Sequence, residues 1–186
     1  QSLIEESHRR TPSSKQFTQK YRGVFADGRV VSGFNPQWKE LIYPLVVDRA
    51  AGAYLWDKDG NRYVDILNGF GAILYGHSPD FIVEAVRRQL DLGFPIGPQT
   101  ELVGECSELI REFTGVERVT FCNTGSEAVM GAMRIARTVT GRNLVVLFAG
   151  DYHGSFDEVL VKAVGDHRSM PAAPGIPRES VANVLV

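Results

Sequence analysis

The sequence predicts an α/β fold in which a mostly parallel sheet carries helices on both faces. Two observations favour this class. Residues 117–148 follow the order strand, glycine-containing turn, helix and strand. Residues 143–148 are also a continuous apolar run, which is typical of a parallel strand covered on both faces. The chain before residue 76 carries a different pattern, and it predicts a separate, hairpin-bearing segment.

The first 75 residues divide into a leader and the start of a small domain. Residues 1–22 are polar and basic without a sustained apolar period, so we expect a linker or docking segment. In residues 53–65, two alternating stretches flank an Asp-Gly pair, which predicts two strands joined by a tight turn. We therefore assign residues 23–75 to the N-terminal part of a small domain and residues 76–186 to the N-terminal part of a large one.

Apolar periodicity predicts two helices at the start of the large domain. One begins after Pro79 and carries an apolar face, and residues 102–113 form the other. Further along, residues 158–164 look strand-like, residues 170–177 form a proline-rich loop, and residues 181–186 begin a fresh strand. A fold that stops within a strand is incomplete, so we expect the natural protein to continue past Val186.

The most informative stretch is residues 123–128, with the sequence Asn-Thr-Gly-Ser-Glu-Ala. The β-branched and aromatic residues 117–122 predict a buried strand before it, and a helix follows from Ser126 to a stop at Gly141. The free N–H groups and the dipole at such a helix start favour an anion, and Gly125 lets the backbone approach it. Thr124 would add a hydroxyl donor, as would Ser126.

The kind of anion is limited by what the sequence lacks. A nucleotide P-loop needs a Gly-Lys-Ser/Thr ending, and a dinucleotide fold needs Gly-x-Gly-x-x-Gly after a strand; neither occurs. A single phosphate therefore fits better. Taken alone, the turn is also explained as an ordinary helix cap with Glu127 in the first helical turn, and this alternative stays open.

A second motif follows the apolar run at residues 143–148. The sequence there is Asp151-Tyr152-His153-Gly154. Ligands of open α/β sheets bind at the carboxyl ends of the strands, so we expect Tyr152 and His153 to reach the same edge as Gly125 and Ser126. Tyr152 would then offer a ring that can stack on a flat cofactor. The alternative for this pair is a half-exposed loop.

Together these motifs resemble the class III aminotransferases, which have the fold of type I pyridoxal-phosphate enzymes, and most closely the glutamate-1-semialdehyde aminomutase branch. The resemblance extends to residues 53–65, 68–71 and 76–79. It implies an incomplete fold-type I large domain and the cofactor pyridoxal 5′-phosphate. It further implies that Thr124, Gly125 and Ser126 hold the phosphate, that Tyr152 stacks on the pyridine ring with His153 beside it, and that Phe70 lies over the substrate.

The chain contains few lysines, and none is a convincing catalytic residue. The only lysines are Lys15, Lys20, Lys39, Lys58 and Lys162. Lys162 lies near the predicted sheet, but nothing around it would lower its pKa as a Schiff-base lysine requires, and we expect a solvated lysine at the end of a strand. We therefore assign no catalytic residue here. By the resemblance, the Schiff-base lysine and the acid that pairs with the pyridinium lie beyond Val186, so this piece alone should be inactive.

The substrate side departs from the aminomutase pattern. Where that branch carries an arginine for a free carboxylate, this chain places Asn35, and losing a bidentate guanidinium weakens carboxylate binding. An acyl thioester has no free carboxylate. Residues 11–15, 21–22, 27 and 32–34 look similar to aminotransferase domains embedded in hybrid polyketide and peptide synthases. We therefore expect transfer of an amino group from a donor amino acid to a keto group on a carrier-tethered acyl chain.

Two alternatives remain open. One is a glutamate-1-semialdehyde-type aminomutase on a small free substrate. The other is a non-catalytic phosphate-binding or interaction fragment. His77 is expected to be a local hydrogen-bonding residue near a helix start and not a catalytic base.

Composition excludes several other functions. The net charge of −2 over 186 residues gives no electrostatic case for nucleic acid or a membrane surface. No apolar stretch approaches the roughly 20 residues of a membrane span. The two cysteines, Cys106 and Cys122, lack metal-like spacing and, like the histidines, predict no metal site. Both fall in apolar-patterned segments, so we expect reduced core residues of a cytoplasmic protein. A homodimer is what the resemblance implies.

Overall fold

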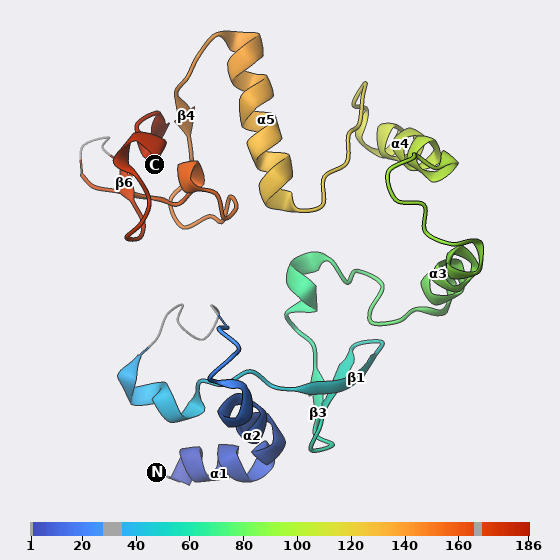
Figure 1. Ribbon diagram of the computed structural model, residues 1–186, viewed down its shortest axis with the longest axis vertical. Helices are drawn as coiled ribbons and strands as arrows, with labels where there is room; N and C mark the ends of the chain where they lie inside the picture. Colours follow the sequence, from blue (N-terminus) through green and yellow to red (C-terminus); the bar gives the residue numbers. More distant parts are fainter. Residues whose placement is uncertain (1, 28–34, 166–168) are drawn as a thin grey trace. The chain divides into compact units, whose positions relative to one another are not determined.

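The computed structural model describes residues 2–27, 35–165 and 169–186. The chain forms two compact units, Gln1–Ile96 and Gly97–Val186, and each has its own small sheets and helices (Figure 1). The domain limits expected at residues 22 and 75 stay predictions.

Two helices occupy the N-terminal segment in which we expected a linker. They are α1, Ser2–Arg10, and α2, Pro12–Tyr21, which has Pro12 at its first position. Polar contacts stabilise both helices. Glu6 pairs with Arg9 and Arg10, one turn further along α1. The Ser14 side chain is fully buried, and its hydroxyl accepts a hydrogen bond of 2.9 Å from the Val46 amide.

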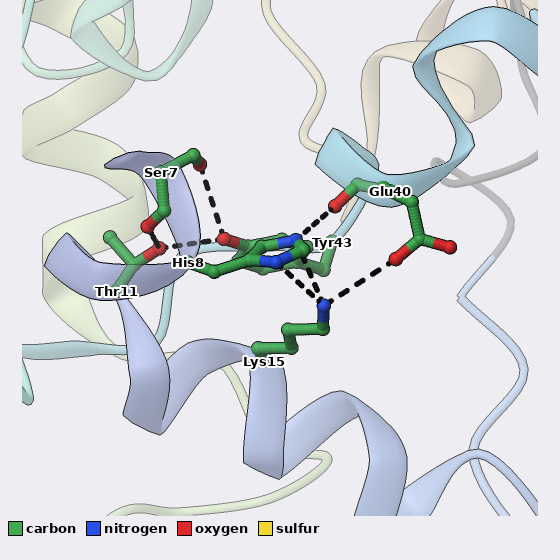
Figure 2. A network of polar contacts seen from close by, with 6 residues as sticks. All are labelled: Ser7, His8, Thr11, Lys15, Glu40 and Tyr43. Atoms are coloured by element: carbon green, nitrogen blue, oxygen red, sulfur yellow. Dashed lines mark hydrogen bonds and ion pairs between the residues drawn. The ribbon is translucent and has the colours of Figure 1, made fainter. Parts of the chain in front are cut away.

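Figure 2 shows a polar network that joins α1 and α2 to η2, Pro36–Leu41, and to the residues after η2; its members are Ser7, His8, Thr11, Lys15, Glu40 and Tyr43. The Tyr43 hydroxyl lies 2.7 Å from the Thr11 hydroxyl. His8 Nε2 lies 2.8 Å from the Glu40 carbonyl oxygen. The ammonium group of Lys15 lies 2.9 Å from His8 Nε2 and 3.4 Å from a Glu40 carboxylate oxygen. The network therefore links both helices to Glu40 and Tyr43 through polar contacts.

The predicted hairpin is confirmed. Strands β1, Val47–Ala51, β2, Tyr54–Asp57, and β3, Arg62–Val64, form an antiparallel sheet in that order. The turn between β2 and β3 contains Gly60 at φ +82°, a conformation that glycine adopts at no steric cost.

Asp57 holds this turn together. Its side chain is almost fully buried and accepts four hydrogen bonds of 2.8–3.0 Å, from the amides of Asp59 and Asn61, the side-chain amide of Asn61 and the hydroxyl of Tyr63. Burial acts to raise the pKa of Asp57, but the hydrogen bonds from Asn61, Tyr63 and Asp59 outweigh it and hold the pKa below its ordinary value. Burial and the bond to Asp57 raise the pKa of Tyr63 to about 12.

The two predicted helices after the hairpin are confirmed as α3, Asp80–Leu92, and α4, Glu101–Thr114. Neither has a buried residue. On α3 the predicted apolar face is exposed, with Phe81 at 57% and Leu90 at 55%, and on α4 Phe113 is exposed at 85%. Each face is apolar, and the described residues do not bury it. The expectation that Cys106 and Cys122 are core residues is wrong, because both are exposed.

In the second unit, the predicted helix is confirmed as α5, Gly125–Thr140, and Gly141 ends it in the left-handed conformation at φ +67°. The remaining elements are short: β4, Val145–Val146; η4, Asp157–Val159; β5, Val161–Ala163; β6, Ser169–Pro171; η5, Arg178–Val181; and β7, Val184–Leu185. Strand β4 pairs parallel with β7, and β5 pairs antiparallel with β6.

The predicted sheet is formed only in part. Residues 117–122, predicted as a strand, contain no strand, and Phe121 is 51% exposed. A strand is defined by its ladder partner, and the described residues give this segment none. The 143–148 run is also not covered on both faces. Leu147 is buried in the core with Met133, Val159 and Val184, whereas Val146 and Phe148 are exposed.

We expect Asp57→Ala to destabilise the hairpin unit, because it leaves Tyr63 and three N–H donors of the turn without their acceptor. The loss should be about 2–4 kcal/mol in the free energy of unfolding. Urea denaturation followed by tryptophan fluorescence, to which Trp56 in β2 contributes, measures this loss. Asp48→Ala, at an exposed position of β1, is the control and should change the free energy little.

The same carboxylate predicts a pH dependence. A lowered pKa in the folded state means that the stabilisation is fully present above the unfolded pKa of about 3.9 and is lost as the pH falls through the folded value. Asp57→Asn should remove this part of the acid sensitivity. An acid-unfolding curve of equal slope in both proteins would contradict the assignment.

Candidate functional site

The N-terminus of α5 is closed by a capping box. The Thr124 hydroxyl accepts a hydrogen bond of 3.2 Å from the Glu127 amide, and a Glu127 carboxylate oxygen accepts one of 2.9 Å from the Thr124 amide. The helix-cap explanation of this turn is therefore confirmed for Thr124 and Glu127. Because the Thr124 hydroxyl also lies 3.3 Å from Glu127 Oε2, it is already engaged within the cap.

The cap leaves two backbone donors open. Within the described residues, the amides of Gly125 and Ser126 donate no hydrogen bond, whereas the Ala128 amide bonds the Thr124 carbonyl at 3.1 Å. A Cβ placed on Gly125 would have no atom of the described chain within 4 Å. The helix start thus presents two N–H groups at the positive end of its dipole, beside open space.

The turn that carries Tyr152 and His153 packs against this helix start. The Ser155 amide donates a hydrogen bond of 3.1 Å to the Ser126 hydroxyl, and the two serine hydroxyl oxygens lie 3.4 Å apart. Gly154 is buried at φ +131°, and a Cβ on it would lie 3.0 Å from Ser126 Oγ and 3.2 Å from Ser126 Cα. The structure therefore brings together the two motifs that sequence order placed at one edge.

The side chains of Tyr152 and His153 differ in exposure. Tyr152 is 80% exposed, so one face of its ring is open for stacking. His153 is half-buried, and its Nε2 atom is buried without a hydrogen-bond partner among the described residues. A buried polar atom without a partner costs free energy, so this nitrogen is suited to bind a group that the chain itself does not supply.

Ser155 was not among the predicted site residues. It contributes a hydroxyl and lies in direct contact with Ser126. The available signal was its position directly after Gly154, because a glycine that allows close backbone approach also brings its neighbour near the helix start. The helix start and Ser155 together offer N–H and O–H donors and no cationic side chain.

The two predicted substrate residues lie in the first unit. Phe70 is 90% exposed and has φ +55°. Asn35 caps η2, and its side-chain oxygen accepts a hydrogen bond of 3.0 Å from the Gln37 amide. Residues 32–34, part of the resemblance on the substrate side, lie outside the described residues.

All five lysines are described, and none is buried. Lys162 lies exposed in β5, where it pairs with Met170. Lys15 is held in the network of Figure 2. None has the desolvated surroundings that would turn an ammonium group into a nucleophile.

The first unit also contains a pocket of about 560 Å³ between α2 and the residues after η2. Its walls combine aromatic rings, among them Phe17, Tyr21 and Tyr43, with charges of both signs. It includes none of the predicted site residues. Among residues 2–27, 35–165 and 169–186, no group of acids, histidines and cysteines could hold a metal ion, and no helix has the length and apolarity that a membrane crossing needs.

Comparison with known proteins gives a consistent result. The family model for Aminotransferase class-III matches residues 35–178. The chain is 44% identical over 154 residues to a glutamate-1-semialdehyde 2,1-aminomutase of Caldivirga maquilingensis, with 80% of this chain and 35% of the relative covered. It is 41% identical over 145 residues to the corresponding protein of Chloroflexus aurantiacus, with 76% and 33% covered.

A solved structure described as a transaminase with PLP bound superposes with a TM-score of 0.81 at 30% identity. The superposition covers 95% of this chain and 41% of that one. The chain therefore spans about a third of the length of the curated relatives it matches.

The contact between Gly154 and Ser126 can be tested by adding a single methyl group. We expect Gly154→Ala to lower the free energy of unfolding by about 1–3 kcal/mol, because its Cβ would press on the Ser126 backbone. Gly175→Ala is the control: its φ of +92° is also one that L-residues rarely adopt, but its Cβ meets nothing within 4 Å. Urea denaturation compares the two variants, and equal losses would show that the close approach is unimportant.

Proposed function

Because the chain belongs to the Aminotransferase class-III family, we propose that it forms the phosphate-binding part of a pyridoxal-phosphate-dependent aminotransferase. The reaction proposed for the whole protein moves an amino group from a donor amino acid to a keto group. The observation that carries the proposal is the packing of the Tyr152–His153 turn on the N-terminus of α5 through Ser126, Gly154 and Ser155.

The described residues fit this cofactor in three ways. The open amides of Gly125 and Ser126, with the hydroxyl of Ser155 nearby, suit a phosphate at a helix start. The exposed ring of Tyr152 suits a flat aromatic partner. The buried, unpartnered Nε2 of His153 suits a polar group of a bound molecule.

The cofactor, when bound, supplies the electron sink for the amino transfer. The chain supplies placement. We propose that the amide N–H groups of Gly125 and Ser126 donate to the phosphate. We further propose that the hydroxyl of Ser155 takes part of the role that we first expected of the Thr124 and Ser126 hydroxyls. The Thr124 hydroxyl, engaged with Glu127, keeps the first turn of α5 in the conformation that leaves those amides open.

For the acceptor, we propose a keto acyl chain tethered as a thioester to a carrier domain. Asn35 supports this, because its position carries no charge and its side-chain oxygen is occupied by the Gln37 amide. A site without a guanidinium there gives a free carboxylate no bidentate partner. We propose that Phe70 is the apolar contact for the acyl chain. We also propose that the whole protein forms a homodimer.

A second function is favoured by one specific finding. Both reported curated relatives are glutamate-1-semialdehyde aminomutases, at 44% and 41% identity. An aminomutase acting on a small free substrate is therefore the alternative proposal. The uncharged Asn35 argues against it.

A non-catalytic fragment is the third possibility, because none of the five lysines has the desolvated surroundings that an aldehyde-binding lysine needs. We propose that none of the five acts as the aldehyde-binding lysine. Lys162→Ala should therefore leave the activity of the full-length enzyme unchanged, which a coupled assay for the keto product of the amino donor measures.

The phosphate site predicts a variant that loses cofactor but not stability. Gly125→Val places a side chain in the open space beside the two free amides, so we expect the affinity of the full-length protein for pyridoxal phosphate to fall about tenfold or more. Absorbance titration measures the affinity, and urea denaturation the stability. Gly131→Val, at an uncrowded position within α5, is the matched control and should bind normally.

Two outcomes would count against the site. If the unaltered full-length protein gave no spectral change with pyridoxal phosphate, the proposed function would be wrong. If Gly125→Val and Gly131→Val weakened binding equally, the loss would reflect α5 in general and not the helix start.

The acceptor proposal predicts a change of preference at residue 35. Asn35→Arg should raise kcat/KM for a keto acid with a free carboxylate, relative to its acyl thioester, by about tenfold, because the new guanidinium pairs with the carboxylate. Asn35→Gln is the control and should leave the ratio unchanged. If Asn35→Arg left this ratio of kcat/KM values unchanged, the substrate carboxylate would not bind near residue 35.

A further inference from the structure

The turn that presents Phe70 has an unusual backbone. In η3, Asn68–Gly71, the φ angles of Asn68, Gly69 and Phe70 are +51°, +56° and +55°, and that of Gly71 is +90°. Left-handed conformations cost L-residues about 1–2 kcal/mol each, and a bulky side chain such as Phe rarely adopts them. The Phe70 side chain is 90% exposed, so its own burial does not compensate for this cost. Other contacts must hold the turn.

Asp65, directly after β3, provides the first of these contacts. Its Oδ1 atom accepts hydrogen bonds from the amides of Leu67, at 3.1 Å, and Asn68, at 3.0 Å. Within the turn, the Phe70 amide bonds the Leu67 carbonyl at 3.0 Å and the Ile73 amide bonds the Asn68 carbonyl at 3.2 Å. The carboxylate thus fixes the residues at which the left-handed turn begins.

His77 holds that carboxylate from the other side. Its Nε2 atom lies 2.8 Å from Asp65 Oδ2, and the two side chains are only 16% and 11% exposed. The His77 backbone is itself fixed by two hydrogen bonds to Gly52, of 2.8 and 3.0 Å. Gly76 allows this pairing, because its φ is +77° and a Cβ on it would lie 2.9 Å from the Gly52 carbonyl oxygen.

The charge on Asp65 agrees with this arrangement. The Asn68 amide and the His77 side chain hold the pKa of Asp65 below its ordinary value, so the group is a carboxylate at neutral pH. The expectation that His77 is a local hydrogen-bonding residue is confirmed, and its partner is the residue that organises the Phe70 turn.

We propose that Asp65 and His77 are positioning residues for substrate: they hold the left-handed turn Asn68–Gly71 so that Phe70 is presented to the acyl acceptor. The inference rests on the proposed function, in which Phe70 contacts the acyl chain. Neither Asp65 nor His77 touches the reacting atoms, and both act through Phe70. A purely structural pair would stabilise the hairpin unit without changing how tightly the acceptor binds.

The kinetic test uses the full-length enzyme loaded with pyridoxal phosphate. His77→Leu should raise KM for the acyl thioester about tenfold, which corresponds to one lost hydrogen bond to a charged group, and should leave the affinity for pyridoxal phosphate unchanged. His77→Gln, which can still donate near the Nε2 position, should restore most of the loss. In a Phe70→Ala background, His77→Leu should add nothing further to KM.

Additive effects of Phe70→Ala and His77→Leu on KM would overturn the proposal. So would an equal rise of KM in His77→Gln and His77→Leu. If His77→Leu fails to fold, Asp65→Asn tests the same link, because its amide oxygen can still accept from Leu67 and Asn68 while the bond to His77 is altered.

A second measurement keeps this inference separate from the proposed function. Hydrogen exchange of the Leu67 and Asn68 amides should become about tenfold faster in His77→Leu and stay unchanged in His77→Gln. His8→Leu, which removes another histidine with polar contacts in the same unit, is the control and should not affect these amides. Unchanged exchange in His77→Leu would overturn the positioning role, even if the protein proved not to be an aminotransferase.

Discussion

The proposed cofactor site depends on the close approach of Gly154 to Ser126. A Cβ at residue 154 would lie 3.0 Å from the Ser126 hydroxyl and 3.2 Å from its Cα, and the φ of +131° is one that L-residues rarely adopt. Glycine therefore favours the packing of the turn after β4 against the N-terminus of α5. That approach also lets the Ser126 hydroxyl accept from the Ser155 amide. Two motifs that begin 28 residues apart, each explained by an ordinary local turn when considered alone, become one surface of donors through this contact.

The first unit uses the same physical device. Gly76 approaches Gly52 closely enough to exclude a Cβ, and this approach allows the paired hydrogen bonds between Gly52 and His77. In both units, a missing side chain lets distant backbone segments meet, and a hydrogen-bonding side chain beside the glycine then organises a turn. In the second unit, Ser126 organises the turn that carries Tyr152 and His153. In the first unit, His77 acts through Asp65 on the turn that carries Phe70.

Local features of the chain were predictable from sequence, whereas features that need distant partners were not. The helix that starts at Gly125 and stops at Gly141 follows from caps and period, and the hairpin follows from its Asp-Gly turn. Residues 117–122 have strand composition but no ladder partner among the described residues. Helices α1 and α2 were not predicted, because contacts that hold them, such as Ser14 with Val46 and Ser13 with Asp59, join residues far apart in sequence. Ser155 was not predicted either, because its partner Ser126 is also distant in sequence.

The donors at the α5 start also favour one kind of anion. Glu127 already occupies the Thr124 amide and hydroxyl, so the donors that remain are the amides of Gly125 and Ser126 and the hydroxyls of Ser126 and Ser155. These groups are neutral, and the turn at residues 123–128 lacks the lysine with which a P-loop reaches the second and third phosphates. The nearby Glu127 carboxylate would repel the additional charge of a polyphosphate. A helix start built in this way is therefore suited to a single phosphate on a flat ring, and it is poorly suited to a nucleotide.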